Sequence, residues 1–364
     1  MIFPYRAMTP MTETVEWYTD VIESYNGTET RAMLRNAPRH RYAMKHRIEN
    51  AAYVKSLLAY GQAGEYHLPL WHMAETVNVS IGATVIPVDT RYADYQTHAI
   101  IWQDPHRCVL VEIEEKTDSS ITLTEPLAAS YQGEIAPARR VKATDIVPIS
   151  DMTGWISDID ISWFCAENYL LTGLELNKYQ TYDVMAWPVL VDAEREFVRP
   201  MEWIDYGTGL VQTDSRMGYT RQNSTARIFL DGKEAIWNFR RWLHQVKGRV
   251  EPFWMPSYAH DVHVEPFLST DTTLYIDRAG LTLEATEHLA FISESGIICR
   301  QVTDSAVYGD GEAIIINAAL GFAGDMSSFT AISFLHLCRL GGDMVEFTWH
   351  RPDQVEVNFP VVML

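Results

Sequence analysis

The feature that most constrains the fold of this 364-residue chain is an ordered set of short motifs that occurs twice. In the first half Glu16-Trp17 is followed by Thr28–Arg31, and in the second half Glu202-Trp203 is followed by Thr213–Arg216. The residue classes and their order match at a spacing of roughly 185 to 200 residues, which is far too long for a solenoid repeat. The sequence therefore predicts that a whole domain is duplicated.

Each half continues with a strand and then a short helix. The first half has a strand-like segment at Arg41–Met44 and a helix from about Ala51 to Tyr60. The second half has a strand at Arg227–Leu230 and then apolar residues at helical spacing. These apolar residues are Ile236, Phe239, Leu243 and Val246.

Residues that favour helix ends flank both predicted helices. Asn50 is expected to cap the first helix and Gly61 to close it. Asp231, with Glu234 three residues later, has the spacing of a capping box for the second helix. Gly248 is expected to end that helix.

Similar segments follow the two helices, at Glu65–Trp71 and at Gly248–Tyr258, each with aromatic residues around a proline. Proline restricts such runs to edge strands or extended arms, and the sequence leaves open whether the first arm is ordered before docking or only on docking. Period-two alternation then predicts strands, with a hairpin turn at Asp310-Gly311. The alternating residues are Val109, Val111, Ile113, Ile121, Leu123, Leu274, Ile276, Leu281, Leu283, Ile314 and Ile316. Near the ends of the halves, Arg140-Val141 precedes Asp145 and Arg339-Leu340 precedes Asp343.

These patterns predict a mainly β fold with short helices (α+β), built as two tandem diverged copies of a β-barrel or β-sandwich module. The first module is placed at residues 1–150 and the second at residues 151–364. The segment 151–200 has no low-complexity composition and is interpreted as the ordered beginning of the second module.

Composition limits the classes of partner. The net charge of −19 disfavours binding of nucleic acid and of anionic membranes, although it suits a channel through which DNA slides. The N-terminus lacks a signal-peptide pattern and no segment has the length of a membrane span, so the expectation is a polypeptide made in the cytoplasm without a membrane anchor. Four widely spaced cysteines give no zinc or iron–sulfur pattern and are expected to be reduced and buried.

No nucleophile elbow, phosphate loop or zinc-protease motif occurs, so no catalytic, cofactor-binding or metal residue is assigned and no cofactor is expected. His260 and His263 are close enough in sequence to share a metal, but no third ligand lies nearby. Asp151, Asp158 and Asp160 form a small acidic cluster without the spacing of a calcium loop. Both sets are interpreted as ordinary polar residues.

One basic stretch stands out in the acidic chain. It fits a docking surface for an acidic neighbour or a solvated face with local ion pairs, and the sequence leaves both open. Trp237 and Trp242 on the second helix are interpreted as packing residues, with a carbohydrate platform as the alternative. The basic stretch is Arg31, Arg35, Arg39, Arg41, Lys45 and Arg47, with Arg216, Arg221 and Arg227 in the corresponding part of the second half.

The arrangement resembles the distal-tail and tail-hub (baseplate) proteins of long-tailed bacteriophages and of gene transfer agents. The residues that carry the resemblance are Thr28–Arg31, the strand Arg41–Met44, the helix-to-proline segment Ala235–Tyr258, and the closing Val345–Trp349 with Phe359-Pro360. The resemblance covers most of both halves and rests on no catalytic or metal motif.

The resemblance implies a virion protein of the tail tip that forms a ring around the tail channel. Its expected partners are further copies of itself, the tail tube protein, and hub and fibre proteins, while DNA passes without specific binding. Three copies of a two-module chain would match a six-fold tube to a three-fold tip, and a hexamer is equally compatible. A glycan-binding or glycan-cleaving β protein, and an enzyme with a dispersed site, are the alternatives.

Overall fold

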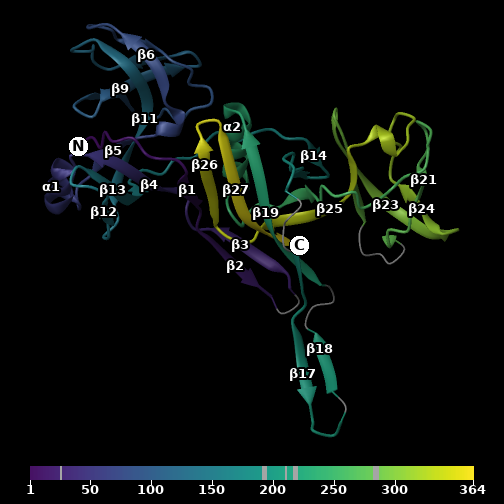
Figure 1. Cartoon of the computed structure of the whole chain (residues 1–364). Helices are drawn as coiled ribbons and strands as arrows, with labels where there is room; N and C mark the ends of the chain where they lie inside the picture. The colour runs from purple at the N-terminus through teal and green to yellow at the C-terminus, as the bar shows by residue number, and fades with distance from the viewer. Residues whose placement is uncertain (25–26, 191–194, 210, 216–219, 282–286) are drawn as a thin grey trace.

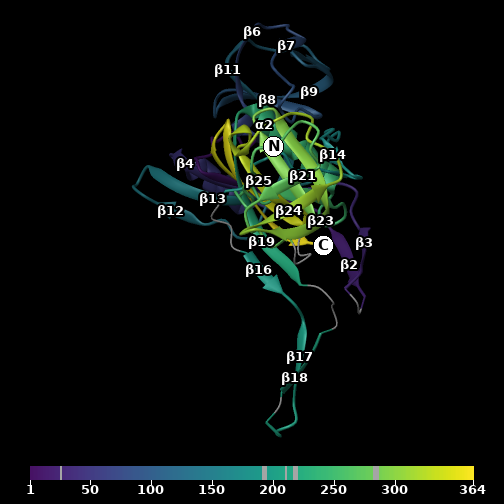
Figure 2. The same cartoon turned by 90° about the vertical axis from the view of Figure 1, so that its right-hand side faces the viewer.

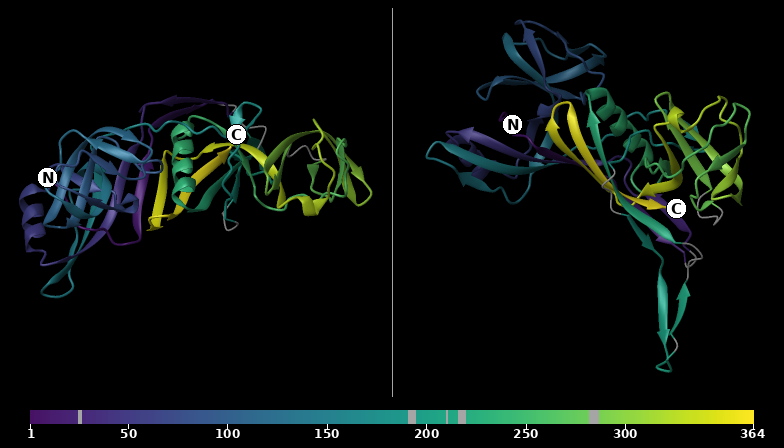
Figure 3. Two further views of the ribbon diagram at one scale, coloured as in Figure 1. Left: turned by 90° about the horizontal axis from the view of Figure 1, so that it is seen from above. Right: turned by 45° about the vertical axis from the view of Figure 1, so that its right-hand side comes forward.

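The computed structural model describes residues 1–24, 27–190, 195–209, 211–215, 220–281 and 287–364. The protein is mainly β, with 52% of residues in strands and 9% in helices, two of which are α-helices, so the predicted mainly β class is confirmed. Figure 1 shows a central sheet, a β domain on either side of it, and a long hairpin that projects away from both. Seen from above, the two β domains lie at opposite ends of an elongated molecule (Figure 3).

The first half contains helix α1 (Ala52–Gly61) and the short 3-10 helix η1 (Trp71–Met73). Its strands up to the helix are β1 (Met11–Glu16), β2 (Thr19–Glu23), β3 (Glu29–Met33) and β4 (Arg39–Glu49). The strands that follow are β5 (Tyr66–Pro69), β6 (Glu75–Val79), β7 (Val85–Pro87), β8 (His98–Asp104), β9 (Arg107–Thr117), β10 (Ser120–Leu123), β11 (Tyr131–Ala143), β12 (Ile149–Asp151) and β13 (Ile156–Cys165).

The second half contains helix α2 (Lys233–Val246) and the short 3-10 helix η3 (Met326–Ser328). Its strands up to the helix are β14 (Lys178–Tyr179), β15 (Tyr182–Asp183), β16 (Arg195–Val198), β17 (Met201–Asp205), β18 (Val211–Ser215) and β19 (Arg221–Asp231). The strands that follow are β20 (Phe253–Pro256), β21 (Thr273–Ile276), β22 (His288–Ser293), β23 (Gly296–Tyr308), β24 (Gly311–Ile316), β25 (Ala331–Leu340), β26 (Met344–Arg351) and β27 (Gln354–Met363).

Eight antiparallel strands form one continuous run through the centre of the molecule, in the order β12, β13, β4, β1, β26, β27, β19, β16. The first four strands come from the first half of the chain and the last four from the second half. The ladder between β1 and β26 joins the two groups, so the halves share a sheet rather than touching only through side chains.

The two halves have the same ladders in the same register. β1 pairs with β4 and β2 with β3, just as β16 pairs with β19 and β17 with β18. A constant shift of 182 residues relates these ladders, because Glu16 lies opposite Arg39 and Val198 lies opposite Arg221. The longest ladders, β4–β13 and β19–β27, also superimpose residue for residue in register.

Each half carries a β domain inserted between the strand after the helix and the next long strand. In the first inserted domain the order is β11, β8, β9, β10, β7, and in the second it is β25, β22, β23, β24, β21. The first inserted domain adds β6 on the other edge of β11. The second inserted domain has its own apolar core, whereas the core of the first is continuous with that of the central sheet.

The predicted helices occur where the apolar spacing placed them, but the predicted caps at their N-termini are wrong. Asn50 has a φ of 51° and its N–H donates to the carbonyl of Trp155, so it turns the chain out of β4. Asp231 is the last residue of β19 and its carboxylate accepts a hydrogen bond from Gln354, so Gly232 begins the turn into α2 without a capping box. Strand pairing has taken both side chains away from the helix ends.

The segment Glu65–Trp71 does not behave as an arm that waits for a partner. β5 pairs with β11, and four side chains of the segment are buried. The turn between β23 and β24 is formed by Gly309 and Asp310, one residue earlier than predicted, since Tyr308 pairs with Gly311. The buried residues of the segment are Tyr66, Leu68, Leu70 and Trp71. Leu283 lies outside the described residues.

Candidate functional site

The junction between the two halves is the part of the molecule with the most unusual chemistry. Met11, Glu13 and Val15 of β1 point into the core across the ladder with β26, and Glu13 is the only charged residue of the three. Helix α2 packs over the same region and places Arg240 on its buried face. Sequence reasoning missed both residues, although a charged residue at a core position of a strand and another within the apolar stripe of a helix were visible signals.

Glu13 is the centre of a buried hydrogen-bond network. Its carboxylate accepts two hydrogen bonds of 2.7 Å from Arg240, and it lies 3.0 Å from Nδ1 of His40. Tyr42 and the indole N–H of Trp349 also donate to it, at 3.3 and 3.2 Å. Four side chains, from β4 of the first half and from α2 and β26 of the second, are thereby fixed around one carboxylate of β1.

A second buried pair adjoins the first. Arg139 of β11 binds Asp94, whose carboxylate also accepts hydrogen bonds from Tyr169 and Gln96. The guanidinium of Arg139 lies 3.6 Å from the centre of the Tyr169 ring, and that ring stacks on His40. The segment after β13 is thus locked onto the junction by charge and by stacking.

The electrostatics of the junction hold its carboxylates charged and its histidines neutral. Burial alone would raise the pKa of Glu13, but Arg240 and His40 hold that pKa well below its usual range. Burial lowers the pKa of His72 to about 4 and that of His244 to about 3. Because the carboxylates of Glu13 and Asp94 are buried and each is paired with an arginine, the arrangement suits the fixing of the two halves.

The first hairpin, β2–β3, is clamped onto the second half by arginines. Glu29 forms two hydrogen bonds of 2.8 Å with Arg339 of β25. Arg221 of β19 bonds to Glu23 at 2.9 Å and to the carbonyl of Gly27. Arg31 donates to the carbonyl of Val250 at 3.1 Å.

Within the part of the chain that the structure describes, no such arginine clamp to the body is seen at the corresponding hairpin of the second half. β17 and β18 pair with each other and project away from the body (Figure 2). Nearly every described side chain of the two strands is exposed. Several of these side chains are large and apolar, which is unusual for a segment in water. The exposed apolar residues of β16, β17 and β18 are Phe197, Val198, Met201, Trp203 and Val211, with Tyr206 in the connecting turn.

A second exposed apolar surface lies at the other end of the eight-strand run. Ile146, Ile149, Met152 and Trp155 lie on or next to β12, and each is exposed, Trp155 by 73%. Among the described residues β12 pairs only with β13, and β16 pairs only with β19. The two outer edges of the central run are therefore bare and apolar.

Most side chains of the basic stretch are paired within the chain. Arg41 binds Glu16 at 2.7 Å, and Arg47 and Lys45 both bind Asp158, at 2.8 and 3.3 Å. The structure thus favours local ion pairs for this stretch, apart from the clamp residue Arg31 and Arg35, which donates to the carbonyl of Glu16. In the second half Arg227 binds Glu356 at 2.7 Å, and Arg216 lies outside the described residues.

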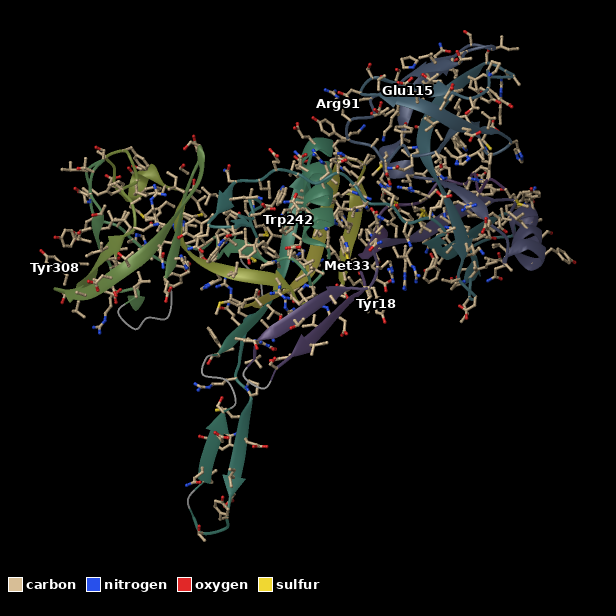
Figure 4. All side chains as sticks on the ribbon, turned by 180° about the vertical axis from the view of Figure 1, so that it is seen from behind. Tyr18, Met33, Arg91, Glu115, Trp242 and Tyr308 are labelled. Atoms are coloured by element: carbon tan, nitrogen blue, oxygen red, sulfur yellow. The ribbon has the colours of Figure 1, made fainter. Side chains whose placement is uncertain are left out.

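The remaining candidates are dispersed. The rings of His260 and His263 lie 6.5 Å apart, and the described residues contain no group of three or more His, Cys, Asp or Glu side chains that could hold a metal. Asp158 is paired with arginine and lysine, and Asp151 with Lys55. Trp242, which is labelled in Figure 4, is fully buried. A mostly apolar cavity of about 720 Å³ is lined by the segment around Val184 and by β22 and β25 of the second inserted domain.

No protein-family model matches the chain, and no curated protein matches it either. Neither helix that the structure describes combines the length and the apolar character needed to cross a membrane.

Proposed function

We propose that this protein is a structural, non-catalytic component of the tail tip of a long-tailed bacteriophage or a gene transfer agent. In this proposal it forms a ring around the tail channel and joins the tail tube to hub or fibre proteins. The observation that carries the proposal is the central run of eight strands, in which one order of four strands occurs twice and both outer edges are unpaired among the described residues.

The proposal includes two diverged copies of one β-rich module. The constant register of the ladders, the helix after the fourth strand and the inserted β domain in each half all support it. Because β13 pairs with β4 and β11, we place the end of the first module after Cys165 rather than at residue 150. The linker from residue 166 onwards then leads into the second module.

The chain contains one joint between its halves, and the two strands that would form the same joint again lie unpaired at its two ends. Repetition of that joint between copies is a heterologous assembly, which closes into a ring when the rotation between subunits permits. Three copies would supply six modules and six copies would supply twelve. Either number is compatible with a six-fold tail tube, so the proposal covers both stoichiometries.

The distribution of charge fits passage of DNA without adhesion. Residues 75–135 hold ten acidic and three basic side chains, and residues 262–331 hold ten acidic and two basic ones. The two inserted domains therefore account for 15 of the 19 net negative charges. Such domains repel nucleic acid at long range, wherever they lie in the assembly.

Negative-stain electron microscopy of the purified protein, with native mass spectrometry on the same sample, tests the proposal. Rings with a central hole and a mass of three or six chains are expected. A particle that stays monomeric at high concentration would reject the self-assembling ring.

A second candidate function is glycan binding. Its specific support is a pair of exposed tyrosines, Tyr275 and Tyr308, whose ring centres lie 4.6 Å apart near the tip of the second inserted domain (Figure 4). Adjacent exposed rings of this kind form platforms for sugars. Binding of lipopolysaccharide or peptidoglycan fragments that is lost in Tyr308→Ala, but kept in the remote variant Tyr60→Ala, would support this candidate.

A further inference from the structure

We propose that the outer edge of β16 in one copy pairs with residues 146–149 of a second copy, in the register with which β1 pairs with β26 inside the chain. The inference rests on the proposed ring and names its subunit contact. Within one chain the run already contains one joint between a strand of the β1 type and a strand of the β26 type. β16 and β12 occupy the same two positions at the two bare ends.

The register of the contact follows from the two ladders. A shift of 182 residues carries β1 onto β16, and a shift of 198 carries β12 onto β26, because Ile149 lies opposite Ile159 just as Phe347 lies opposite Val357. Val15 lies opposite Val345 within the chain. The equivalent partners between copies are Phe197 and Val147.

The same shifts give the neighbouring partners of the contact. Val198 falls opposite Ile146, and Arg195 falls opposite Ile149, because Glu16 and Glu13 lie opposite Met344 and Phe347 within the chain.

The backbone of the acceptor segment is compatible with this ladder. The carbonyl of Pro148 accepts a hydrogen bond from Asp160, so the nitrogen of Pro148 also faces β13. The proline therefore removes no donor from the outer edge, toward which the backbone N–H and C=O groups of Val147 and Ile149 are directed. On the donor side, the N–H of Trp17 donates to the carbonyl of Asp343, which immediately precedes β26. By the 182-residue shift, the N–H groups of the odd-numbered residues of β16, Arg195 and Phe197, face outward.

Burial at the equivalent positions differs in the direction that the proposal requires. Val15 and Phe347 are buried, at 2% and 0% exposure, where the joint is formed within the chain. Their equivalents Phe197 and Ile149 are 77% and 39% exposed, where no joint is formed. Pairing of the two ends would bury both side chains against each other's sheets and would remove two exposed apolar surfaces at once.

The same residue shifts also give the projecting hairpin β17–β18 partners of matching charge on the next copy. Glu23 binds Arg221 within the chain, and the equivalent pair between copies is Asp205 with Arg39, which keeps the signs of the charges. Asp343 accepts the N–H of Thr19 at 2.8 Å, and its equivalent on the acceptor copy is Asp145.

The donor to Asp145 is then the N–H of Met201. The hairpin β17–β18 thus clasps the first module of the next copy as β2–β3 clasps the second module of its own chain.

Disulfide cross-linking tests the register in the full-length protein. Val198 and Ile146 would form a non-hydrogen-bonded pair with Cα atoms about 4.5 Å apart, which is within the range that a disulfide spans. The double variant Val198→Cys with Ile146→Cys is expected to give covalent multimers on oxidation. Each single variant, and the pair shifted by one residue, Val198→Cys with Val147→Cys, are the matched controls and should give none, since a shift of one residue puts the side chains on opposite faces.

Charge substitution tests the two surfaces separately. Phe197→Asp and Ile149→Asp are each expected to convert the ring to monomers in sedimentation velocity, whereas Leu268→Asp, an exposed change in the second inserted domain, should leave the ring intact. A mixture of Phe197→Asp and Ile149→Asp chains retains one intact contact per pair. It should give dimers and no larger species, which an interface of identical surfaces would not do.

The outcomes separate the contact from the function. Suppose that the wild-type protein forms rings but the double variant Val198→Cys with Ile146→Cys does not cross-link, or that the rings survive both aspartate substitutions. Either result would overturn this contact and leave the proposed ring in place. A wild-type protein that never forms rings would overturn the proposed function as well.

Discussion

The carboxylate of Glu13 and the guanidinium of Arg240 form two hydrogen bonds of 2.7 Å across the junction between the two halves, and both side chains are almost fully buried. A buried ion pair adds little net stability over well-packed apolar residues, but removal of one partner strands a charge in the core. The pair is therefore better understood as fixing one arrangement of the two halves. The equivalent positions hold Arg195, on the bare edge strand β16, and Leu58, buried on helix α1. These two cannot form an ion pair, so the internal joint is chemically distinct from the proposed joint between copies.

Loss of Arg240 should be strongly destabilising. The variant Arg240→Met leaves Glu13 buried and charged without its main partner, and we expect the free energy of unfolding to fall by about 3 to 5 kcal/mol at pH 7, measured with urea. The double variant Glu13→Leu with Arg240→Met removes both charges and should regain most of the loss. A single variant within 1 kcal/mol of wild type would contradict this role for the pair.

Stability should fall as the pH falls from about 6.5 to 4. Burial lowers the pKa of both His46 and His72 to about 4, while an unfolded histidine has a pKa of about 6.5. In this window the unfolded chain binds protons that the folded chain does not. Each such histidine therefore lowers the free energy of unfolding by up to about 1.4 kcal/mol per pH unit.

His72 provides the variant for that measurement. Neither of its ring nitrogens has a hydrogen-bond partner among the described residues, and its ring lies 4.2 Å from that of Trp349. His72→Phe should keep the packing and reduce the pH dependence of unfolding by about one proton between pH 6.5 and 4. His106→Phe, an exposed change, is the control, and equal slopes in the two variants would count against buried neutral histidines as the cause.

The clamp on the first hairpin should be measurable by hydrogen exchange. Glu29 and Arg339 are 4% and 8% exposed, so Arg339→Ala leaves a nearly buried carboxylate with fewer partners. We expect faster exchange of amides in β2 and β3 and a loss of about 1 to 3 kcal/mol in the free energy of unfolding. Arg199→Ala, near the projecting hairpin, should change neither quantity. Unchanged exchange in β2 and β3 would mean that apolar packing alone holds the hairpin.

The sequence predicted the mainly β class and the positions of both helices, because apolar periodicity reflects burial directly. It aligned the halves incorrectly. Glu16-Trp17 was matched to Glu202-Trp203, yet the ladders place Val198 at the position of Glu16 and Val21 at the position of Trp203. Equivalent strands of the two halves keep the same pattern of buried positions and turns, but they do not keep the same amino acids. At the 182-residue shift of the ladders few residues are shared, among them Gly27 with Gly209 and Arg39 with Arg221.

The junction was beyond sequence reasoning for a related reason. The partners Glu13 and Arg240 are 227 residues apart, and only the ladder between β1 and β26 brings them together. The matching of Arg140 to Arg339 was also wrong, since the register makes Lys142 the equivalent of Arg339. Arg140 and Lys142 are both basic, so the sequence comparison identified the right type of side chain at the clamp although it chose the wrong residue.

The two tryptophans of α2 should respond very differently to truncation. Trp242 is fully buried and packs against Trp187, Phe239 and Phe253, with ring centres 5.0 to 5.4 Å apart. Trp242→Ala opens a large cavity between the helix and the sheet, and we expect a loss of about 3 to 5 kcal/mol in the free energy of unfolding. Trp237 is only half-buried, beside a small cavity at the end of the helix, so Trp237→Ala should lose much less. Similar losses in urea unfolding would mean that the helix is not seated by Trp242, and binding of a sugar lost only in Trp237→Ala would favour the carbohydrate platform instead.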